Sequence, residues 1–435
     1  MIVMKFGGSS VADSAKIRNV ADIVRKSRGK NPAVVVSALG GTTDMLIKIA
    51  KLSPKKRHEA EMQKLREKHL KVIRELGIRE SVISGELEGL ERLTRMVNSL
   101  TPKISDHIAS FGERMSARIV AGYMSSIGMK AKAFDAYEIG MVTDSNFGFA
   151  DVLPETYSNV KRSLPRNCIP VITGFIGKDR RGEITTIGRG GSDYTASIIG
   201  AAIGAEEIQI WTNVNGIMSA DPRIVKSAHN IRDMSYEEES ELEFLGSPTL
   251  HLKGIIPAVE NKITVRILNT LNPGQRGTVI TQNIDAGRRV ASITHKEKMC
   301  IINIYNPGLL FEKNVSGSLS EALQRHKVSA EIISISKSNV MILLNEIQNK
   351  DISGVAKELK GMGSVEIKHR LAKVSIVGKS VAAIPGISQR MLSAVRSMPV
   401  EATLCSGSKT SQSFIVKERD AKGAVRLLHK EFFGA

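Results

Sequence analysis

The sequence predicts an α/β protein, in which a three-layer α/β/α domain with a mainly parallel sheet is followed by two smaller α+β units. Apolar runs of strand length alternate with helix-like stretches between residue 1 and about residue 282. Such alternation favours a parallel sheet covered by helices on both faces. Beyond residues 285–289, which are expected to form a linker, a βαββα order of elements occurs twice.

The elements of the first domain are predicted from apolar runs and helical periodicity. The first strand is the apolar run that ends at Gly7 and Gly8. A charged stretch at 51–79 with a partial apolar face predicts a solvated amphipathic helix. Further strands are expected at 34–37, 130–135, 170–174, 207–211 and 264–268, and helices at 15–26, 108–127 and 193–203.

The two C-terminal units are predicted in the same way. The first has a strand at 300–305, a helix at 312–326, strands at 328–336 and 340–344, and a helix at 351–359. The second has a strand at 374–377, a helix at 389–396, strands at 400–406 and 413–416, and a helix at 421–433. By analogy of fold, such units serve a catalytic domain as regulatory or dimerisation modules.

Composition is that of an ordinary globular protein. The 435 residues, 42% apolar and 24% charged, suffice for two or three domains. The three widely spaced cysteines, Cys168, Cys300 and Cys405, argue against a disulfide framework or a zinc site and favour a reducing, cytoplasmic location. The sequence shows neither a signal-peptide pattern nor an apolar run of bilayer length, so no membrane partner is expected.

The net charge of +18 raises the question of a nucleic-acid partner. Aromatic residues make up only 4% of the chain, and no recognition motif accompanies the charge. Glutamates interleave with the basic residues of 51–79, where the surplus concentrates. A solvated helix face therefore explains the charge better than a nucleic acid does, and the positive field would attract anionic substrates.

The N-terminal segment MIVMKFGGSS carries the strongest local signal. Glycines after a strand let backbone N–H groups approach an anion closely, because no Cβ stands in the way. Lys5 supplies a compact positive charge beside them. Together these residues predict a phosphate cradle.

Four further segments have the character of a ligand site. Residues 37–44 (SALGGTTD) and 174–177 (GFIG) follow apolar strands, and 188–195 (GRGGSDYT) is a glycine-dense loop that runs into a helix. Residues 110–116 (SFGERMS) open a helix, which would place Glu113 in or near its first turn. In a parallel sheet, ligands bind at the carboxyl ends of strands and at helix N-termini.

The residue types suit phosphoryl transfer to a small amphoteric molecule. Lys5 would neutralise the transferred phosphate, Arg189 could hold a carboxylate, and Glu113 could accept from an ammonium group. Asp193 could orient Lys5 or help to place Mg²⁺ beside nucleotide phosphates. The backbone amides that would cradle phosphoryl oxygens belong to Gly7, Gly8, Gly40, Gly41, Gly190 and Gly191.

Each residue also has a structural alternative. Lys5 could be a surface lysine after an edge strand, Glu113 a helix-start acid, and Asp193 an N-cap. Because five segments all have the sequence features of a ligand-binding site, we favour a ligand site over five unrelated structural roles.

The segments KFGGSS, VSALGGTTD, SFGERMS, GFIG, GRGGSDYT and WTNVNGIMSADPR, in this order, resemble the aspartokinases of the amino-acid-kinase superfamily. The resemblance covers essentially the whole chain. It implies a catalytic domain over 1–283 and tandem ferredoxin-like ACT domains over 296–435, divided at about residue 370 into 296–370 and 371–435. It also implies ATP-dependent phosphorylation of the L-aspartate β-carboxylate to 4-phospho-L-aspartate, the first step of lysine, threonine and methionine biosynthesis, with Mg²⁺ accompanying the nucleotide.

The resemblance also implies residue roles, without a dedicated set of metal ligands. Lys5 and Asp193 match the catalytic positions. The acceptor-site positions are matched by Ser37, Thr43, Glu113, Phe175, Arg189 and Ser192. The nucleotide-site positions are matched by Lys5, Gly7, Gly8, Ser9, Gly190, Gly191, Thr212, Asn213, Met218 and Arg223.

The nucleotide end departs from the family pattern. Asn213 and Asn215 stand where carboxylates are usual, Met218 where a tyrosine is usual, and Pro248 where a lysine is usual. Two alternatives therefore stay open: a kinase that acts on homoserine, and a weakly catalytic protein that senses amino acids. The ACT resemblance further implies an amino-acid effector and a homodimer joined through these modules.

Overall fold

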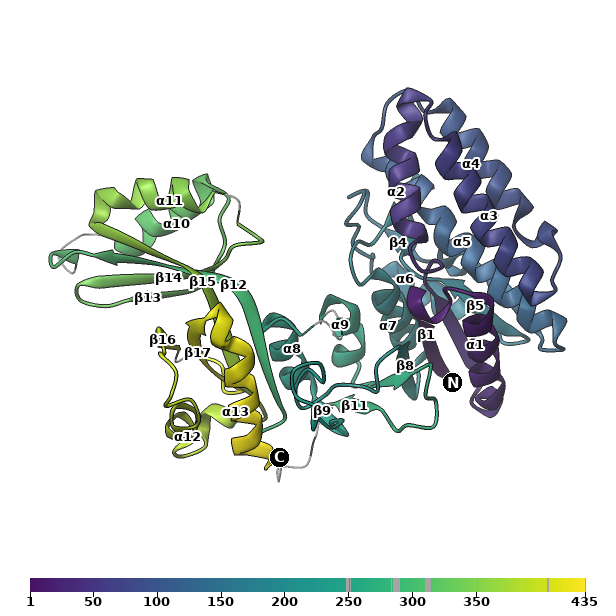
Figure 1. Ribbon diagram of the computed structural model, residues 1–435. Coiled ribbons are helices and arrows are strands. Elements are labelled where there is room, and N and C mark those ends of the chain that lie inside the picture. The colour runs from purple at the N-terminus through teal and green to yellow at the C-terminus, as the bar shows by residue number, and fades with distance from the viewer. Residues whose placement is uncertain are drawn as a thin grey trace. The chain divides into compact units, whose positions relative to one another are not determined.

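A computed structural model describes residues 1–247, 250, 252–282, 284, 290–309, 314–349, 351–404 and 407–434 (Figure 1). The chain forms two compact units. The first consists of Met1–Ile217, Asn230–Glu239 and Pro248–Ile284, and the second of Met218–His229, Ser240–Ser247 and Asp285–Ala435. The predicted linker at 285–289 and the divergent Pro248 lie outside the described residues.

The first unit is built on an eight-stranded sheet with the order β3-β5-β2-β1-β8-β10-β11-β9. Every pairing in it is parallel except that of β10 with β11. Central β1 is buried because its apolar residues face helices on both sides. The strands are β1 (Ile2–Phe6), β2 (Pro32–Val36), β3 (Ala131–Phe134), β5 (Ile169–Thr173), β8 (Glu207–Thr212), β9 (Asp233–Ser235), β10 (Thr264–Asn269) and β11 (Thr278–Thr281).

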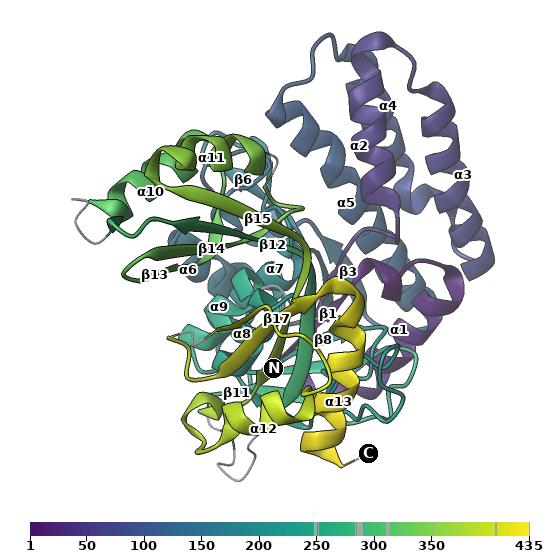
Figure 2. The ribbon, with the colours of Figure 1, turned by 60° about the vertical axis from the view of Figure 1, so that its left-hand side comes forward.

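Helices cover both faces of this sheet, which confirms the predicted three-layer arrangement (Figures 1 and 2). Helices α1 to α5 share one apolar core with the side chains of Ile2, Met4 and Phe6. Helix α7 packs on the opposite face, with α6 and α9 beside it. The helices are α1 (Ser14–Lys26), α2 (Thr42–Leu52), α3 (Glu59–Leu76), α4 (Ser84–Met96), α5 (Pro102–Ser126), α6 (Glu155–Ser163), α7 (Gly191–Ile203) and α9 (Leu252–Glu260). Helix α8 (Tyr236–Phe244) begins in this unit and ends in the second.

The charged stretch at 51–79 contains an amphipathic helix, as predicted. Helix α3 buries Met62, Leu65 and Ile73 and exposes most of its charged side chains. A small separate sheet in the same unit consists of β4 (Val142–Thr143), β6 (Ile176–Asp179) and β7 (Ile184–Thr186).

The second unit has one six-stranded antiparallel sheet with the order β13-β14-β12-β15-β17-β16. Helices α10 and α11 pack on one half of this sheet, and α12 and α13 on the other half. The elements are β12 (Ser292–Tyr305), α10 (Val315–Arg325), β13 (Ala330–Ile335), β14 (Asn339–Asn345), α11 (Ile352–Leu359), β15 (Ser364–Val377), α12 (Ile387–Ala394), β16 (Ala402–Leu404), β17 (Ser411–Lys417) and α13 (Ala421–Phe433).

Strands β12 and β15 are much longer than the predicted strands at 300–305 and 374–377. Each has 14 residues and runs through both halves of the sheet (Figure 2). The first part of β12 was not predicted as a strand, because residues 294–298 are polar and show neither apolar–polar alternation nor an apolar run. The two predicted βαββα units therefore share one continuous sheet.

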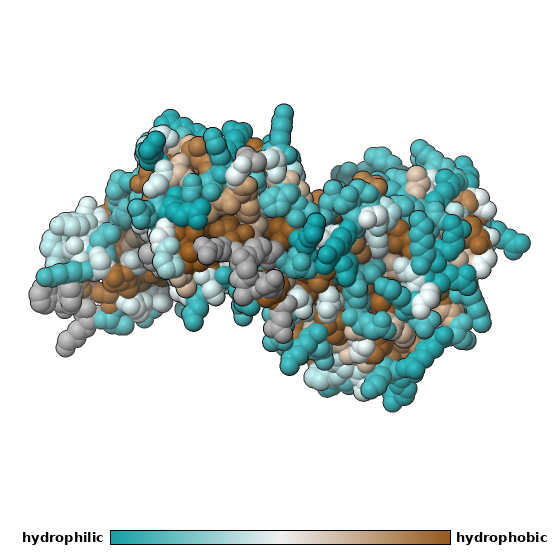
Figure 3. Space-filling view, turned by 90° about the horizontal axis from the view of Figure 1, so that it is seen from below, coloured by the Kyte–Doolittle hydropathy of each residue, from teal (hydrophilic) through white to brown (hydrophobic). Residues whose placement is uncertain are grey.

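Hydrophilic side chains cover much of the surface that Figure 3 shows, with smaller apolar areas between them. Among the described residues, we find no helix with the length and apolar character that crossing a bilayer requires.

Candidate active site

A cavity of about 590 Å³ lies in the first unit, beside the segments that follow β1, β2 and β5 and the first turn of α7. It brings together all five sequence segments that were predicted to form a site. Its lining consists of Lys5, Gly8, Ser9, Ser37, Ala38, Leu39, Gly40, Gly41, Thr43, Glu113, Phe175, Gly188, Arg189, Gly190, Gly191, Ser192 and Asp193.

Lys5 and Asp193 form an ion pair at this cavity. The distance from Lys5 Nζ to Asp193 Oδ1 is 2.6 Å, and the two side chains are only 11% and 13% exposed. Asp193 lies in the first turn of α7, whose N-cap is Gly190 in the left-handed conformation (φ 76°), so Asp193 is not itself the cap. The carboxylate therefore fixes the ammonium group at the end of β1, on the side where the cavity opens.

The two paired-glycine turns lie against each other. A Cβ on Gly8 would come within 2.8 Å of the Ala38 carbonyl oxygen, and Gly41 has a φ of 77°. Only glycine allows both the close approach and the left-handed backbone without strain. The backbone of both turns is thus brought to one cavity wall, as a phosphate cradle requires.

Lys68, on α3, supports the second of these turns. Its ammonium group donates a hydrogen bond to the carbonyl oxygen of Gly40, and a Cβ on Gly41 would lie 3.8 Å from Lys68 Nζ. Desolvation lowers the pKa of this half-buried lysine. Lys68 was not predictable as a site residue, because it lies among many solvated charges in a helix whose sequence shows only amphipathic periodicity.

We expect Lys68→Met to lower the turnover of the enzyme about tenfold, because one orienting hydrogen bond to the glycine turn is lost. Lys68→Arg should restore part of the loss, and the neighbouring exposed Lys64→Met should have no effect. Steady-state kinetics on the three variants check this. Equal turnover of Lys68→Met and the parent would show that the contact does not position the turn.

Glu113 lies in the middle of α5, so its predicted place in or near the first turn was wrong. The helix begins eleven residues earlier, where the side chain of Thr101 accepts from Ile104 N and Pro102 stands at the first helical position. The Thr-Pro pair is a helix-start signal, which the sequence analysis did not use.

The carboxyl group of Glu113 is buried and incompletely satisfied. Glu113 Oε1 accepts from Ala38 N at 3.1 Å, whereas Oε2 has no hydrogen-bond partner among the described residues. Desolvation raises the pKa of this carboxyl group to about 8. An unpartnered, buried carboxylate oxygen that borders a cavity is suited to a cationic group of a ligand.

The remaining acceptor-site candidates surround the same space. Ser37 Oγ donates to Ser192 Oγ at 3.0 Å, and a Cβ on Gly174 would collide with the Ser192 side chain at 2.5 Å. Phe175 has a positive φ of 68°, which is strained for an aromatic residue. Arg189 is exposed and forms no salt bridge within the described part of the chain, so its guanidinium group can engage a ligand.

Only some of the residues predicted to bind the nucleotide line this cavity. Ser9, Gly190 and Gly191 line the cavity with Lys5, whereas Gly7, Thr212 and Asn213 do not. Gly7 nevertheless lies beside the end of β8, because its N–H donates to the carbonyl of Trp211 at 3.3 Å. Met218 and Arg223 belong to the second unit, where Arg223 pairs with Asp221 at 2.7 Å. The roles of these residues remain predictions.

A larger cavity, of about 900 Å³, lies in the second unit and has a different chemistry. Its lining consists mainly of Lys, Arg and Glu side chains and contains no glycine turn. The smaller cavity is the candidate active site because it alone, within the described residues, joins glycine turns to Lys5 and Asp193.

Comparison with known proteins agrees with this geometry. Residues 1–269 match the model of the amino acid kinase family, and residues 374–432 match an ACT domain. The chain is 34% identical to a chloroplastic aspartokinase of Arabidopsis thaliana over 99% of this chain and 80% of that protein. It is 27% identical to the lysine-sensitive aspartokinase 3 of Escherichia coli, over 100% of this chain and 99% of that protein.

Solved structures give the same result. The structure superposes on the crystal structure of E. coli aspartokinase III in complex with aspartate and ADP with a TM-score of 0.81. This superposition covers 100% of each chain, and the two sequences are 27% identical. The superposition on the crystal structure of the aspartate kinase of Clostridium acetobutylicum covers 99% of this chain and 100% of that chain. Its TM-score is 0.87, and the two sequences are 27% identical. The resemblance predicted from the sequence is confirmed, and the chain belongs to the amino acid kinase family as a member of the aspartokinases.

Proposed function

We propose that the enzyme transfers the γ-phosphoryl group of ATP to the β-carboxylate of L-aspartate, which yields 4-phospho-L-aspartate and ADP. The observation that carries this proposal is the joining, in one cavity, of the Lys5–Asp193 pair with the exposed Arg189 and with Glu113, whose Oε2 has no hydrogen-bond partner among the described residues. Similarity to aspartokinases over the full length supports it, including one solved with aspartate and ADP.

The acceptor is held by complementary charges. Glu113 would accept hydrogen bonds from the α-ammonium group, and Arg189 would bind the α-carboxylate bidentately. The hydroxyl groups of Ser37, Thr43 and Ser192 offer further hydrogen bonds around the same space, and Phe175 closes one side. This arrangement leaves the β-carboxylate to face Lys5.

Transfer requires little covalent chemistry from the protein. The β-carboxylate has a pKa near 4 and is ionised at neutral pH, so no general base is needed. One of its oxygens forms the new bond to the γ-phosphorus while the bond to the ADP oxygen breaks. Lys5, held by Asp193, neutralises the charge on the transferred group, and backbone N–H groups of the glycine turns bind its oxygens.

The residues also fit Mg²⁺ bound with the nucleotide. Asp193 lines the cavity beside the Gly190–Gly191 turn, and Mg²⁺ is commonly held by one or two carboxylates together with substrate phosphates. The ion would supply charge neutralisation on the nucleotide. For the nucleotide itself we propose contacts from Gly7, Gly8, Ser9, Gly190, Gly191, Thr212 and Asn213.

Measurement of ADP formation with L-aspartate and with L-homoserine tests the acceptor. Homoserine carries the same α-groups, so Glu113 and Arg189 would hold both, but its hydroxyl would profit from a general base that the site does not offer beyond Asp193. We expect turnover with aspartate and at most slow turnover with homoserine. Turnover with homoserine alone would overturn the proposal, and so would no turnover with either amino acid at any ATP concentration.

We further propose that the second unit joins two copies of the chain and binds an amino-acid effector. An E. coli aspartokinase III structure in complex with lysine and aspartate has a TM-score of 0.84 to this chain. Strand β13 lies at the edge of the sheet and exposes Ile333 (40%) and Ile335 (46%). An apolar strand at the edge of the described sheet, paired on one side only, favours pairing with a second copy. A biosynthetic role in the cytoplasm accords with the cysteine usage of the chain and stays a prediction.

Replacement of Ile335 by lysine is therefore expected to convert a dimer into a monomer, since the charge would be buried at the edge. Size-exclusion chromatography with light scattering at micromolar concentration checks this. The matched control is Leu271→Lys, because Leu271 is 63% exposed in the first unit. A parent protein that is monomeric would contradict the proposed dimer.

A further inference from the structure

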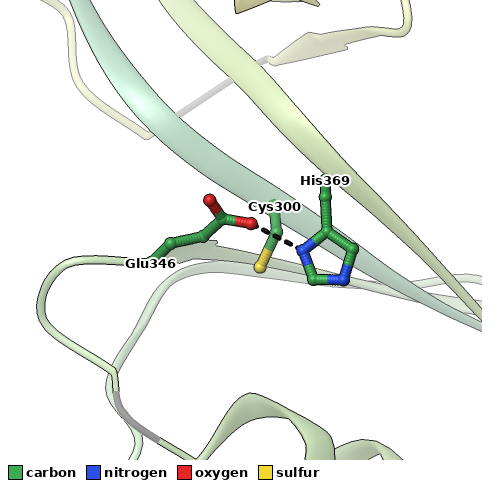
Figure 4. A group of neighbouring side chains, drawn as sticks. All are labelled: Cys300, Glu346 and His369. Carbon is green, nitrogen blue, oxygen red and sulfur yellow. Dashed lines mark hydrogen bonds and ion pairs between the residues drawn. The ribbon is translucent and has the colours of Figure 1, made fainter.

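Three potential metal ligands meet in the sheet of the second unit. Cys300 comes from β12, Glu346 directly follows β14, and His369 comes from β15 (Figure 4). One ligand atom of each residue lies within 4.8 Å of the other two. His369 Nδ1 is also hydrogen-bonded to a carboxylate oxygen of Glu346 at 2.6 Å. Strand pairing thus gathers a thiol, a carboxylate and an imidazole that are far apart in the sequence.

Irregular strand pairing aims these side chains at one another. Met299 pairs with Leu371 and Ile301 pairs with Lys368, so Cys300 lies opposite two residues of β15 instead of one. One of these two, Arg370, has a left-handed backbone with a φ of 56°. This is a β-bulge, a feature that commonly re-aims a side chain beside a functional site.

The carboxylate is positioned by the neighbouring strand pair. Glu346 N donates to the carbonyl of Lys298 at 2.8 Å, which continues the pairing of β12 with β14 by one residue. Lys298 also has a positive φ, 57°. Two non-glycine residues in the left-handed region therefore flank the cluster in β12 and β15, although strand pairing alone requires neither.

The burial of the three groups differs in a way that suits an ion. Cys300 is buried within an apolar core, Glu346 is partly exposed, and the side chain of His369 is 55% exposed. His369 also lines the cavity of about 900 Å³ in this unit, which gives access from solvent. The protein thus supplies three ligands from the sheet side, and water can complete the coordination from the open side.

We propose that Cys300, Glu346 and His369 bind one late divalent transition-metal ion, with Zn²⁺ as the biological candidate. Sulfur, nitrogen and oxygen donors together favour Zn²⁺ and its neighbours over Mg²⁺ and Ca²⁺, which prefer oxygen donors alone. The ion would tie β12, β15 and the end of β14 together where the two halves of the sheet join. The cysteine spacing argued against a zinc site, because it lacks a metal-binding pattern.

Titration of the full-length protein with Co²⁺, after treatment with a chelator, tests the proposal. The variant Cys168→Ser, Cys405→Ser retains Cys300 as the single cysteine of the chain. We expect it to bind one Co²⁺ with a thiolate-to-metal charge-transfer absorption band, and Cys300→Ser to lose this band. Absence of the band from the double variant, or its persistence in Cys300→Ser, would overturn the proposal.

The two ligands outside the core, Glu346 and His369, give a second test that does not depend on a core substitution. Glu346→Gln and His369→Ala should each weaken Zn²⁺ binding, measured by competition with a chromophoric chelator, by about tenfold or more. The control is His326→Ala, which removes another histidine that is paired with carboxylates, those of Asp351 and Glu358. Unchanged Zn²⁺ affinity in both ligand variants, or an equal loss in the control, would contradict the site.

Discussion

Replacement of Lys5 by methionine is expected to lower kcat by about 10³-fold or more, which is the cost of removing a charged group that stabilises a transferring phosphoryl group. Methionine keeps the length and the apolar stem of lysine but removes the charge. Because Lys5 is 11% exposed and pairs with Asp193 at 2.6 Å, no other lysine among the described residues that line the cavity can replace it. Steady-state measurement of kcat with aspartate checks the prediction.

Two further variants separate chemistry from folding. Lys16→Met removes a surface lysine that pairs with Asp13 and should leave kcat unchanged. Lys5→Met leaves the Asp193 carboxylate without its cation, so Lys5→Met combined with Asp193→Asn should regain thermal stability without regaining activity. A kcat of Lys5→Met within threefold of the parent value would contradict the role assigned to this ammonium group.

Replacement of Glu113 by glutamine is expected to raise KM for aspartate by about 10- to 100-fold at pH 8, because the charge-assisted contact with the substrate ammonium group is lost. Burial raises the pKa of Glu113 to about 8 in the ligand-free protein. The carboxyl group must therefore lose a proton before it can pair with an ammonium group. In the parent enzyme, KM for aspartate should fall as the pH rises from 6 to 8 and then level off.

The same group makes stability depend on pH. A carboxyl group whose pKa is raised on folding contributes stability below its unfolded pKa, and this contribution is lost as the pH rises toward about 8. The free energy of unfolding of the ligand-free parent should therefore decrease as the pH rises from the unfolded pKa of the carboxyl group to about 8. In Glu113→Gln this decrease should be smaller. Denaturant unfolding at several pH values measures it, with exposed Glu88→Gln as the control. A pH profile of KM that is identical in parent and Glu113→Gln would refute the proposed ammonium contact.

Much of the candidate site was predictable because its residues follow strands. In a parallel sheet, the carboxyl ends of β1, β2 and β5 share one edge, so glycine turns placed there by sequence converge in space. One of the two roles suggested for Asp193 was to orient Lys5, and an ion pair between the two residues is present. The fold class was confirmed for a related reason, since alternation of strand and helix leaves few arrangements.

What the sequence did not predict depends on contacts between distant elements. The support of the Gly40–Gly41 turn by Lys68 needs the packing of α3, and the cluster around Cys300 needs the register of three strands. The burial of Glu113 in the middle of α5 likewise comes from tertiary packing, because its sequence neighbours suggested a helix start. Local patterns do not specify which distant strands and helices become neighbours in the folded chain.

Chemical trapping of the product tests the central claim most directly. An acyl phosphate reacts with hydroxylamine to give a hydroxamate, whereas a phosphate ester on a hydroxyl group does not. With ATP, Mg²⁺ and L-aspartate, we predict formation of the aspartate β-hydroxamate in a 1:1 ratio to ADP. Formation of ADP without hydroxamate would contradict phosphoryl transfer to the β-carboxylate.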